Sequence, residues 1–134
     1  MKVDVLVEKG KDNLFSVNMI YYELDFGLSG FGKTAEEAIN DFYQCWDEAK
    51  EMCIEDRKEV PQLEFNIKYD VTSFLNYYEG ILSKSGLEKI TGINQKQLWH
   101  YSSGKRHPKP VTAKKIQESL YRFAEDLRQV QLNY

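Results

Sequence analysis

The spacing of apolar residues separates a strand-forming part of this chain from a helix-forming part. Apolar residues alternate with polar ones over residues 2–8 and again over 15–21, which is the pattern of strands that bury one face. Turn-forming residues at 10–13 lie between the two segments, so a β-hairpin is expected. A short third strand is expected over 28–31, and a last strand over 63–67.

A long helix is expected between the third and fourth strands. Thr34 and Glu37 form a Thr-x-x-Glu capping box, in which each side chain satisfies the free backbone amide of the other. Apolar residues then follow at steps of three and four and form one stripe. They are Ala35, Ala38, Ile39, Phe42, Trp46, Ala49 and Cys53. The element order β-β-β-α-β predicts an α/β domain over residues 1–69.

The remainder of the chain, residues 70–134, carries helical spacing only. A second capping box, Ser85-x-x-Glu88, is expected to begin one helix, and Thr112 is expected to begin the last. Asp70 is suited to cap the first helix of this part, whose inward residues are Val71, Phe74, Leu75, Tyr78 and Leu82. The whole chain is therefore expected to be α+β, with an all-α domain after the α/β domain.

Two glycines mark the ends of short helices in the second domain. Gly92 suits the left-handed conformation at a helix end, and Asn94 with Gln97 then caps the next helix almost at once. Gly104 ends that helix and precedes a basic loop. Two short helices joined by a turn that contains glycine form the helix-turn-helix pattern.

Charge is distributed unevenly along the chain. Residues 1–68 carry 8 Lys and Arg against 15 Asp and Glu, a net charge of −7, whereas residues 69–134 carry 10 against 6, a net charge of +4. No acid lies between Glu88 and Glu118. That interval holds Lys89, Lys96, Lys105, Arg106, Lys109, Lys114 and Lys115. Such asymmetry indicates a nucleic-acid-binding module beside a domain with another role, although a basic face that contacts only solvent is the alternative.

A helix over residues 94–103 would place Leu98 and Tyr101 toward the core and its other residues outward. The major groove of DNA admits such a helix, whose N-terminal residues reach base edges. Gln95 is then expected to pair with adenine and Lys96 with guanine, whereas the basic loop contacts phosphates. The expected DNA site comprises Gln95, Lys96, Trp99, His100, Ser103, Lys105 and Arg106. A solvated helix face is the alternative, and Trp99 equally suits a thymine methyl group or a subunit contact.

The second domain resembles the helix-turn-helix of Xre and Cro type. The resemblance rests on residues 87–95 (LEKITGINQ), on Leu98, and on residues 101–106 (YSSGKR) with Pro108. The shared features are a glycine at the turn, an apolar residue after it, and Gly-Lys-Arg-x-Pro after the recognition helix. Glu88 departs from this pattern, because many members carry a small alanine there against the recognition helix.

The first domain resembles HicB antitoxins. Residues 30–38 (GFGKTAEEA) are similar to the Gly-x-Thr-x-x-Glu-Ala start of the helix in that family. The resemblance implies a β-β-β-α-β partial RNase-H-like domain without nuclease chemistry, often followed by a DNA-binding domain. It further implies an antitoxin without a cofactor, which neutralises a small basic HicA-like toxin that cleaves RNA and represses its own operon by binding duplex DNA. Residues 23–25 (ELD) depart from the family's usual Pro-Asp segment.

Expectations about assembly and location follow from the last helix and from composition. Apolar residues recur there at steps of 4, 3, 4, 3 and 4, at Ile116, Leu120, Phe123, Leu127, Val130 and Tyr134. This seam favours packing on the second domain or a homodimer or higher homo-oligomer. No run approaches the ~18–20 apolar residues of a membrane span, and no signal peptide is evident. Cys45 and Cys53 are too far apart on one helix for a disulfide, so a cytoplasmic protein is expected.

Three other functions stay open. A stand-alone transcription regulator would use its first domain to sense a ligand or to dimerise. A metal-dependent nuclease would need converging carboxylates, such as Asp4, Asp25 and Asp47. An interaction adaptor would never bind DNA through its basic domain. No enzyme activity is expected, because no histidine lies in the first domain to activate a nucleophile. No metal site is expected at His100 and His107.

Overall fold

The computed structural model describes residues 1–10, 12–21 and 23–134, and it divides into two compact units, Met1–Tyr77 and Tyr78–Tyr134. Within those residues the fold is α+β, as predicted, with four strands in one sheet and five helices. Lys11, which belongs to the predicted turn at 10–13, lies outside the described residues.

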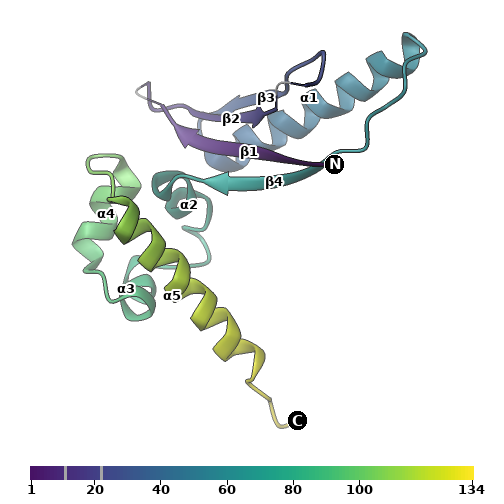
Figure 1. Ribbon diagram of the computed structural model, residues 1–134. Helices are drawn as coiled ribbons and strands as arrows, with labels where there is room; N and C mark the ends of the chain where they lie inside the picture. The colour runs from purple at the N-terminus through teal and green to yellow at the C-terminus, as the bar shows by residue number, and fades with distance from the viewer. Residues whose placement is uncertain (11, 22) are drawn as a thin grey trace. The chain divides into compact units, whose positions relative to one another are not determined.

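The first unit contains a four-stranded mixed sheet (Figure 1). Strand β1 pairs antiparallel with β2, β2 pairs antiparallel with β3, and β4 joins β1 in parallel. The strands are β1 (Lys2–Lys9), β2 (Phe15–Ile20), β3 (Ser29–Gly32) and β4 (Glu64–Tyr69), in the order β3-β2-β1-β4. The predicted order β-β-β-α-β is confirmed, and the alternating residues Val3, Val5, Val7 and Val17 are buried on one face.

Helix α1 (Ala35–Glu55) covers that face of the sheet (Figure 1). Of the two hydrogen bonds predicted for the capping box at its N-terminus, the structure shows one. The Thr34 hydroxyl accepts a hydrogen bond from the Glu37 amide at 3.1 Å, but the Glu37 carboxylate accepts from the Lys33 amide at 2.9 Å rather than from Thr34. Phe42 and Trp46 are buried against β4, where their rings meet that of Phe65 edge to face.

Two glycines of β3 allow α1 to approach the sheet closely. A Cβ atom at Gly30 would overlap the carbonyl oxygen of Ala38 and the backbone nitrogen of Phe42, and one at Gly32 would lie 2.6 Å from the Cβ of Glu37. These atoms belong to α1, and most of them are backbone atoms, so they could make room only if the helix as a whole moved away from the sheet. The glycines that precede Thr34 in the sequence therefore serve helix–sheet packing.

Helix α2 (Val71–Tyr77) also belongs to the first unit. The sequence places the boundary between the two domains after Tyr69, whereas the boundary between the two compact units follows Tyr77. The helix is tied to the first unit because Asn76 accepts a hydrogen bond from the Ala35 amide at 3.2 Å and the rings of Tyr69 and Tyr77 lie 5.7 Å apart.

Asp70 caps α2 as predicted, since its carboxylate accepts from the Ser73 amide at 2.7 Å. The prediction that this helix continues to Leu82 is wrong. The Tyr78 carbonyl accepts from the amides of Ile81 and Leu82 in a separate turn. Gly80 lies within this turn, and glycine is a poor helix former.

The Ser73 hydroxyl is fully buried and has no hydrogen-bond partner among the described residues. Burying an unpaired hydroxyl costs about 1–3 kcal/mol. We therefore expect Ser73→Ala to leave the free energy of unfolding unchanged or to raise it by about 1 kcal/mol. Thermal unfolding followed by circular dichroism measures this effect. Ser83→Ala is the matched control, because it removes a hydroxyl that accepts from Gly86, and it should cost about 1 kcal/mol. A clear loss of stability in Ser73→Ala would contradict the expectation.

The second unit consists of α3 (Lys84–Thr91), α4 (Gln95–Ser103) and α5 (Pro110–Arg128). Its core contains Leu87, Leu98, Tyr101 and Ile116. Gly92 and Gly104 end α3 and α4, as predicted. Both adopt the left-handed conformation, with φ of 75° and 79°, which the sequence predicts for Gly92.

Two predicted helix starts in the second unit are wrong. The N-cap of α3 is Ser83 rather than Ser85, and its hydroxyl accepts from the Gly86 amide at 3.0 Å. Helix α5 begins two residues before Thr112, with Lys109 as N-cap and Pro110 as the first helical residue. Proline is favoured at that position, because the missing N–H would have no partner within the helix.

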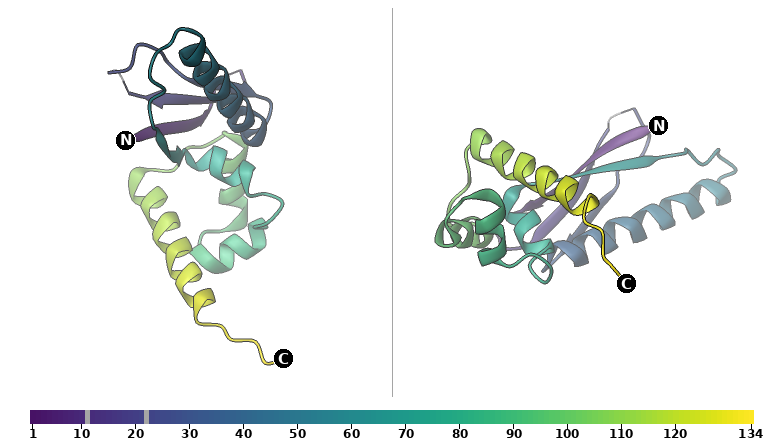
Figure 2. Two further views of the ribbon diagram at one scale, coloured as in Figure 1. Left: turned by 90° about the vertical axis from the view of Figure 1, so that its right-hand side faces the viewer. Right: turned by 90° about the horizontal axis from the view of Figure 1, so that it is seen from below.

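The predicted apolar seam of the last helix is only partly present. Ile116 is buried, but every residue from Tyr121 to Tyr134 is exposed. The helix ends at Arg128, so Val130 and Tyr134 lie in the tail beyond it. Figure 2 shows the end of α5 and this tail extending past α3 and α4.

Candidate nucleic-acid interface

One face of α4 and the turn that follows it carry the predicted DNA-contacting side chains. Leu98 and Tyr101 are buried, as expected for the inward face. The outward residues are exposed except His100, which is half-buried. We call this set the basic surface: Gln95, Lys96, Trp99, His100, Ser103, Lys105 and Arg106.

The turn after α4 is held by hydrogen bonds that place Lys105 and Arg106 beside the helix end. The Arg106 amide donates to the His100 carbonyl at 3.2 Å, and the Lys105 amide donates to the Ser103 hydroxyl at 3.3 Å. The Ser103 hydroxyl itself donates to the His100 carbonyl at 3.2 Å. Ser103 is thus engaged in forming the turn.

The positive potential of this surface acts on His100. Partial burial lowers the pKa of the imidazole below its ordinary 6.5, and the nearby charges of Lys105, Arg106 and Lys96 lower it further. Three basic side chains from two different segments therefore act together on a single group. The lowered pKa favours the neutral imidazole over the charged one.

Trp99 has a partner that the sequence did not indicate. The ammonium group of Lys84 lies 4.9 Å from the centre of the Trp99 ring, and the Lys84 side chain is only 8% exposed. Its ion pair with Glu79 is long, at 4.0 Å. A cation over the face of an indole is a favourable contact. Lys84 thus supports one side of Trp99, a residue that is still 55% exposed.

The N-terminus of α4 is capped from two sides. Asn94 accepts from the Lys96 amide at 2.7 Å, as predicted. Gln97 does not complete the predicted box, because its amide nitrogen donates to the Tyr101 hydroxyl at 3.0 Å. Glu88 of α3 instead accepts from the backbone amide of Gln95 at 3.4 Å and from its side-chain nitrogen at 3.1 Å. Glu88 lies seven residues away on another helix, so no local motif indicated this contact.

The carboxylates considered for a nuclease site each have a different basic partner. Asp4 is bound by Asn66 at 2.9 Å and by Lys68 at 3.1 Å, and both hydrogen bonds lower the pKa of its carboxyl. Asp25 pairs with Lys58 and Asp47 with Lys50. Among the described residues, no three His, Cys, Asp or Glu side chains are grouped so as to hold a metal ion.

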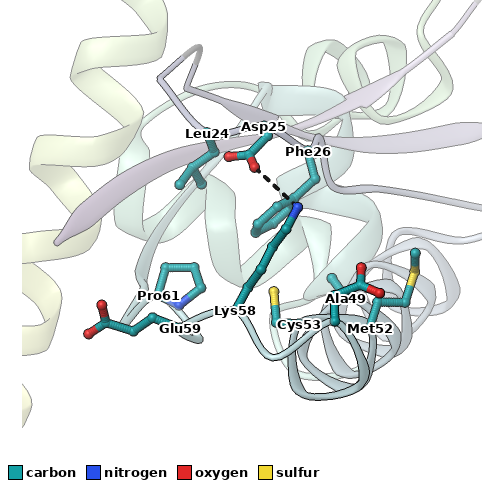
Figure 3. Close-up of a pocket in the computed structure, with 10 residues that line it drawn as sticks. Leu24, Asp25, Phe26, Ala49, Met52, Cys53, Lys58, Glu59 and Pro61 are labelled. Carbon is teal, nitrogen blue, oxygen red and sulfur yellow. Dashed lines mark ion pairs between the residues drawn. The ribbon is translucent and has the colours of Figure 1, made fainter.

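The first unit also carries an acidic helix face and a pocket. The exposed acids of α1 are Glu36, Glu37, Asp41, Asp47, Glu48, Glu51 and Glu55. The pocket, of about 320 Å³, is lined by the end of α1, by residues 24–26 and by residues 58–61. Lys58 extends across it toward Asp25, 3.8 Å away (Figure 3).

No helix within the described ranges is long and apolar enough to cross a membrane. Comparison of the chain with protein-family models, with curated proteins and with solved structures finds no match.

Proposed function

We propose that this chain is a cytoplasmic antitoxin of HicB type, whose second unit binds duplex DNA through the basic surface and represses its own operon. One observation carries the DNA-binding part of this proposal. Gln95, Lys96 and Trp99 are exposed on one face of α4, and Lys105 and Arg106 are exposed in the turn that follows the helix. This combination supplies both kinds of contact that sequence-specific DNA binding requires.

The division of roles follows from side-chain chemistry. The amide of Gln95 matches adenine and the ammonium of Lys96 matches guanine, and both residues lie in the first turn of α4, which reaches base edges in helix-turn-helix proteins. Lys105 and Arg106 lie beyond the helix end, where they suit phosphate contacts that position the protein without reading sequence. Bound in this way, the second unit would cover its operator.

The toxin-binding role is assigned to the first unit. Its acidic face on α1 and the net charge of −7 over residues 1–68 would attract a small basic toxin that cleaves RNA. The complex should therefore weaken as salt is raised. Isolation of the chain from its own cells at low salt should yield a small basic protein in equal amount, and RNA cleavage should appear only after the two are separated. RNA cleavage by the intact complex, or a chain that carries no such partner, would overturn this part.

Two copies are expected to act together, since operators of helix-turn-helix proteins commonly contain two half-sites. The exposed apolar residues at the end of α5 and in the tail suit a contact between copies: Tyr121, Phe123, Leu127, Val130, Leu132 and Tyr134. Sedimentation of the full chain should give a dimer or a higher oligomer that Leu127→Glu dissociates. A wild-type monomer, both free and on DNA, would contradict this assembly.

DNA binding should depend on pH through His100. Its pKa is below 6.5 in the free protein, and DNA phosphates would raise it, so the complex takes up a proton that the free protein lacks. The association constant should therefore rise as the pH falls through the pKa that His100 has in the complex, and it should level off below its pKa in the free protein. Fluorescence anisotropy between pH 8 and pH 5 measures this dependence, which His100→Gln should remove. An affinity that stays constant or decreases as the pH is lowered would contradict the assignment.

A second candidate function is supported by the pocket of the first unit. A volume of about 320 Å³ is within the range of small-molecule sites. The chain would then be a stand-alone regulator in which a ligand bound between α1 and residues 58–61 changes DNA binding. Equal operator affinity with and without a cell extract of small metabolites would count against this candidate.

A further inference from the structure

The side chain of Glu88 joins α3 to the beginning of α4. Its two carboxylate oxygens accept from two groups of one residue: the backbone amide of Gln95 at 3.4 Å and the side-chain nitrogen of Gln95 at 3.1 Å. Gln95 is the first residue of α4, so its backbone amide has no acceptor within the helix. A carboxylate at a helix N-terminus is also favoured by the helix dipole.

These contacts select one orientation of the Gln95 carboxamide. An ionised carboxylate can only accept hydrogen bonds, so the amide nitrogen must face Glu88. Rotation of the amide by 180° would place the Gln95 oxygen against a carboxylate oxygen. The other amide hydrogen and the Gln95 oxygen are left to face outward from α4, where Gln95 is exposed.

That outward pair matches the edge of adenine. In the major groove adenine offers one acceptor, N7, and one donor, the N6 amino group, and a glutamine amide binds both at once. A freely rotating glutamine could also present its donor or its acceptor to other bases. We propose that Glu88 is a specificity-determining positioning residue, which holds Gln95 ready to read adenine. This inference rests on the proposed reading of DNA by α4.

The negative charge of Glu88 should also affect DNA binding in a second way, by lowering overall affinity. A carboxylate close to bound DNA repels phosphates, so Glu88 should lower affinity for every duplex while it raises discrimination at one base pair. Glutamine at position 88 would still accept from Gln95 through its oxygen but would carry no charge. Alanine would lose both the hydrogen bonds and the charge.

The test compares the full chain with four variants on the duplex from upstream of its own gene and on duplexes with single base-pair changes. Wild type should lose about 5- to 150-fold in affinity when the adenine read by Gln95 is changed. Gln95→Ala identifies that base pair, because it removes the penalty there. We expect Glu88→Ala to reduce the same penalty to less than about threefold and Glu88→Gln to retain it. Both Glu88 variants should bind a scrambled duplex more tightly than wild type.

Glu118→Ala is the matched control, because it removes one negative charge of the second unit from a residue paired only with Lys114 in the described structure. It should strengthen non-specific binding and keep full discrimination. If Glu88→Ala is unfolded at the assay temperature, Glu88→Met replaces it, since methionine keeps the side-chain length. Unchanged discrimination in the folded alanine or methionine variant would overturn the inference and leave the proposed function intact. A wild-type protein without preference at any base pair would overturn both.

Discussion

Gly30→Ala is expected to destabilise the first unit strongly while the stability of the second unit is unchanged. The added methyl group would overlap backbone atoms of Ala38 and Phe42, which lie one turn apart on α1. Overpacking costs ~1–3 kcal/mol where side chains can adjust. Here the sheet and the helix would have to separate, so we expect a loss of more than about 3 kcal/mol, a large share of the ~5–15 kcal/mol that stabilises a domain.

Trp46 reports this change, because it is buried between α1 and the sheet. With Trp99 replaced by phenylalanine, the emission of Gly30→Ala should become that of an exposed tryptophan at denaturant concentrations in which wild type is still folded. Gly27→Ala is the matched control, since a Cβ there meets no atom within 4 Å. Native emission and an unchanged unfolding midpoint in Gly30→Ala would show that α1 does not pack on β3 in this way.

The double variant Lys105→Ala/Arg106→Ala is expected to show the second large effect, a loss of duplex affinity that is the same for every sequence. Each phosphate contact contributes about 0.9 to the slope of log affinity against log salt concentration, so two lost contacts should lower the slope by about 2. At ~0.15 M salt this corresponds to roughly 30-fold weaker binding. Both side chains are exposed, so folding should be unaffected.

Salt titrations of the double variant and wild type on two duplexes measure this loss. Lys50→Ala/Lys58→Ala is the matched control, because it removes two positive charges from the first unit, where each lysine pairs with an aspartate. The control should retain the wild-type slope. Equal weakening by the two double variants would mean that net charge, rather than the basic surface, determines DNA affinity.

The parts of the fold that depend on local chemistry are those the sequence predicts well. Alternating valines predict β1, Thr34 predicts the start of α1, and the glycines at 92 and 104 predict the ends of two helices. In each case neighbouring residues determine the backbone conformation, so the pattern is sufficient. The element order of the first unit follows from the same patterns.

Predictions fail where two local solutions compete. Ser83 and Ser85 are both suitable caps, and the fold uses Ser83. Lys84 is then the first residue of α3, and it is buried with its ammonium group over the Trp99 ring. Thr112 has the chemistry of a cap, but Pro110 two residues earlier already has the backbone angle of a helix start. Packing and proline geometry, rather than capping preference alone, select the start in these helices.

The candidate site could be predicted only as a set of outward positions. Helical periodicity places Gln95 and Trp99 on the exposed face of α4, and the structure agrees. Helical periodicity does not reveal that Glu88 binds Gln95 or that Lys84 lies against Trp99, because these contacts join separate helices. They depend on how α3 packs on α4, which becomes visible only in three dimensions.

The most direct test of the DNA-binding account is the ratio of affinities for the duplex upstream of the chain's own gene and for a scrambled duplex of equal length and composition. Fluorescence anisotropy of the full chain at ~0.15 M salt should give a ratio of about 1,000 or more for wild type, as specific binders do. For Gln95→Ala/Lys96→Ala we expect a ratio close to one, with both duplexes still bound weakly through Lys105 and Arg106. Equal binding of the two duplexes by wild type, unchanged in the variant, would contradict the claim that α4 reads DNA.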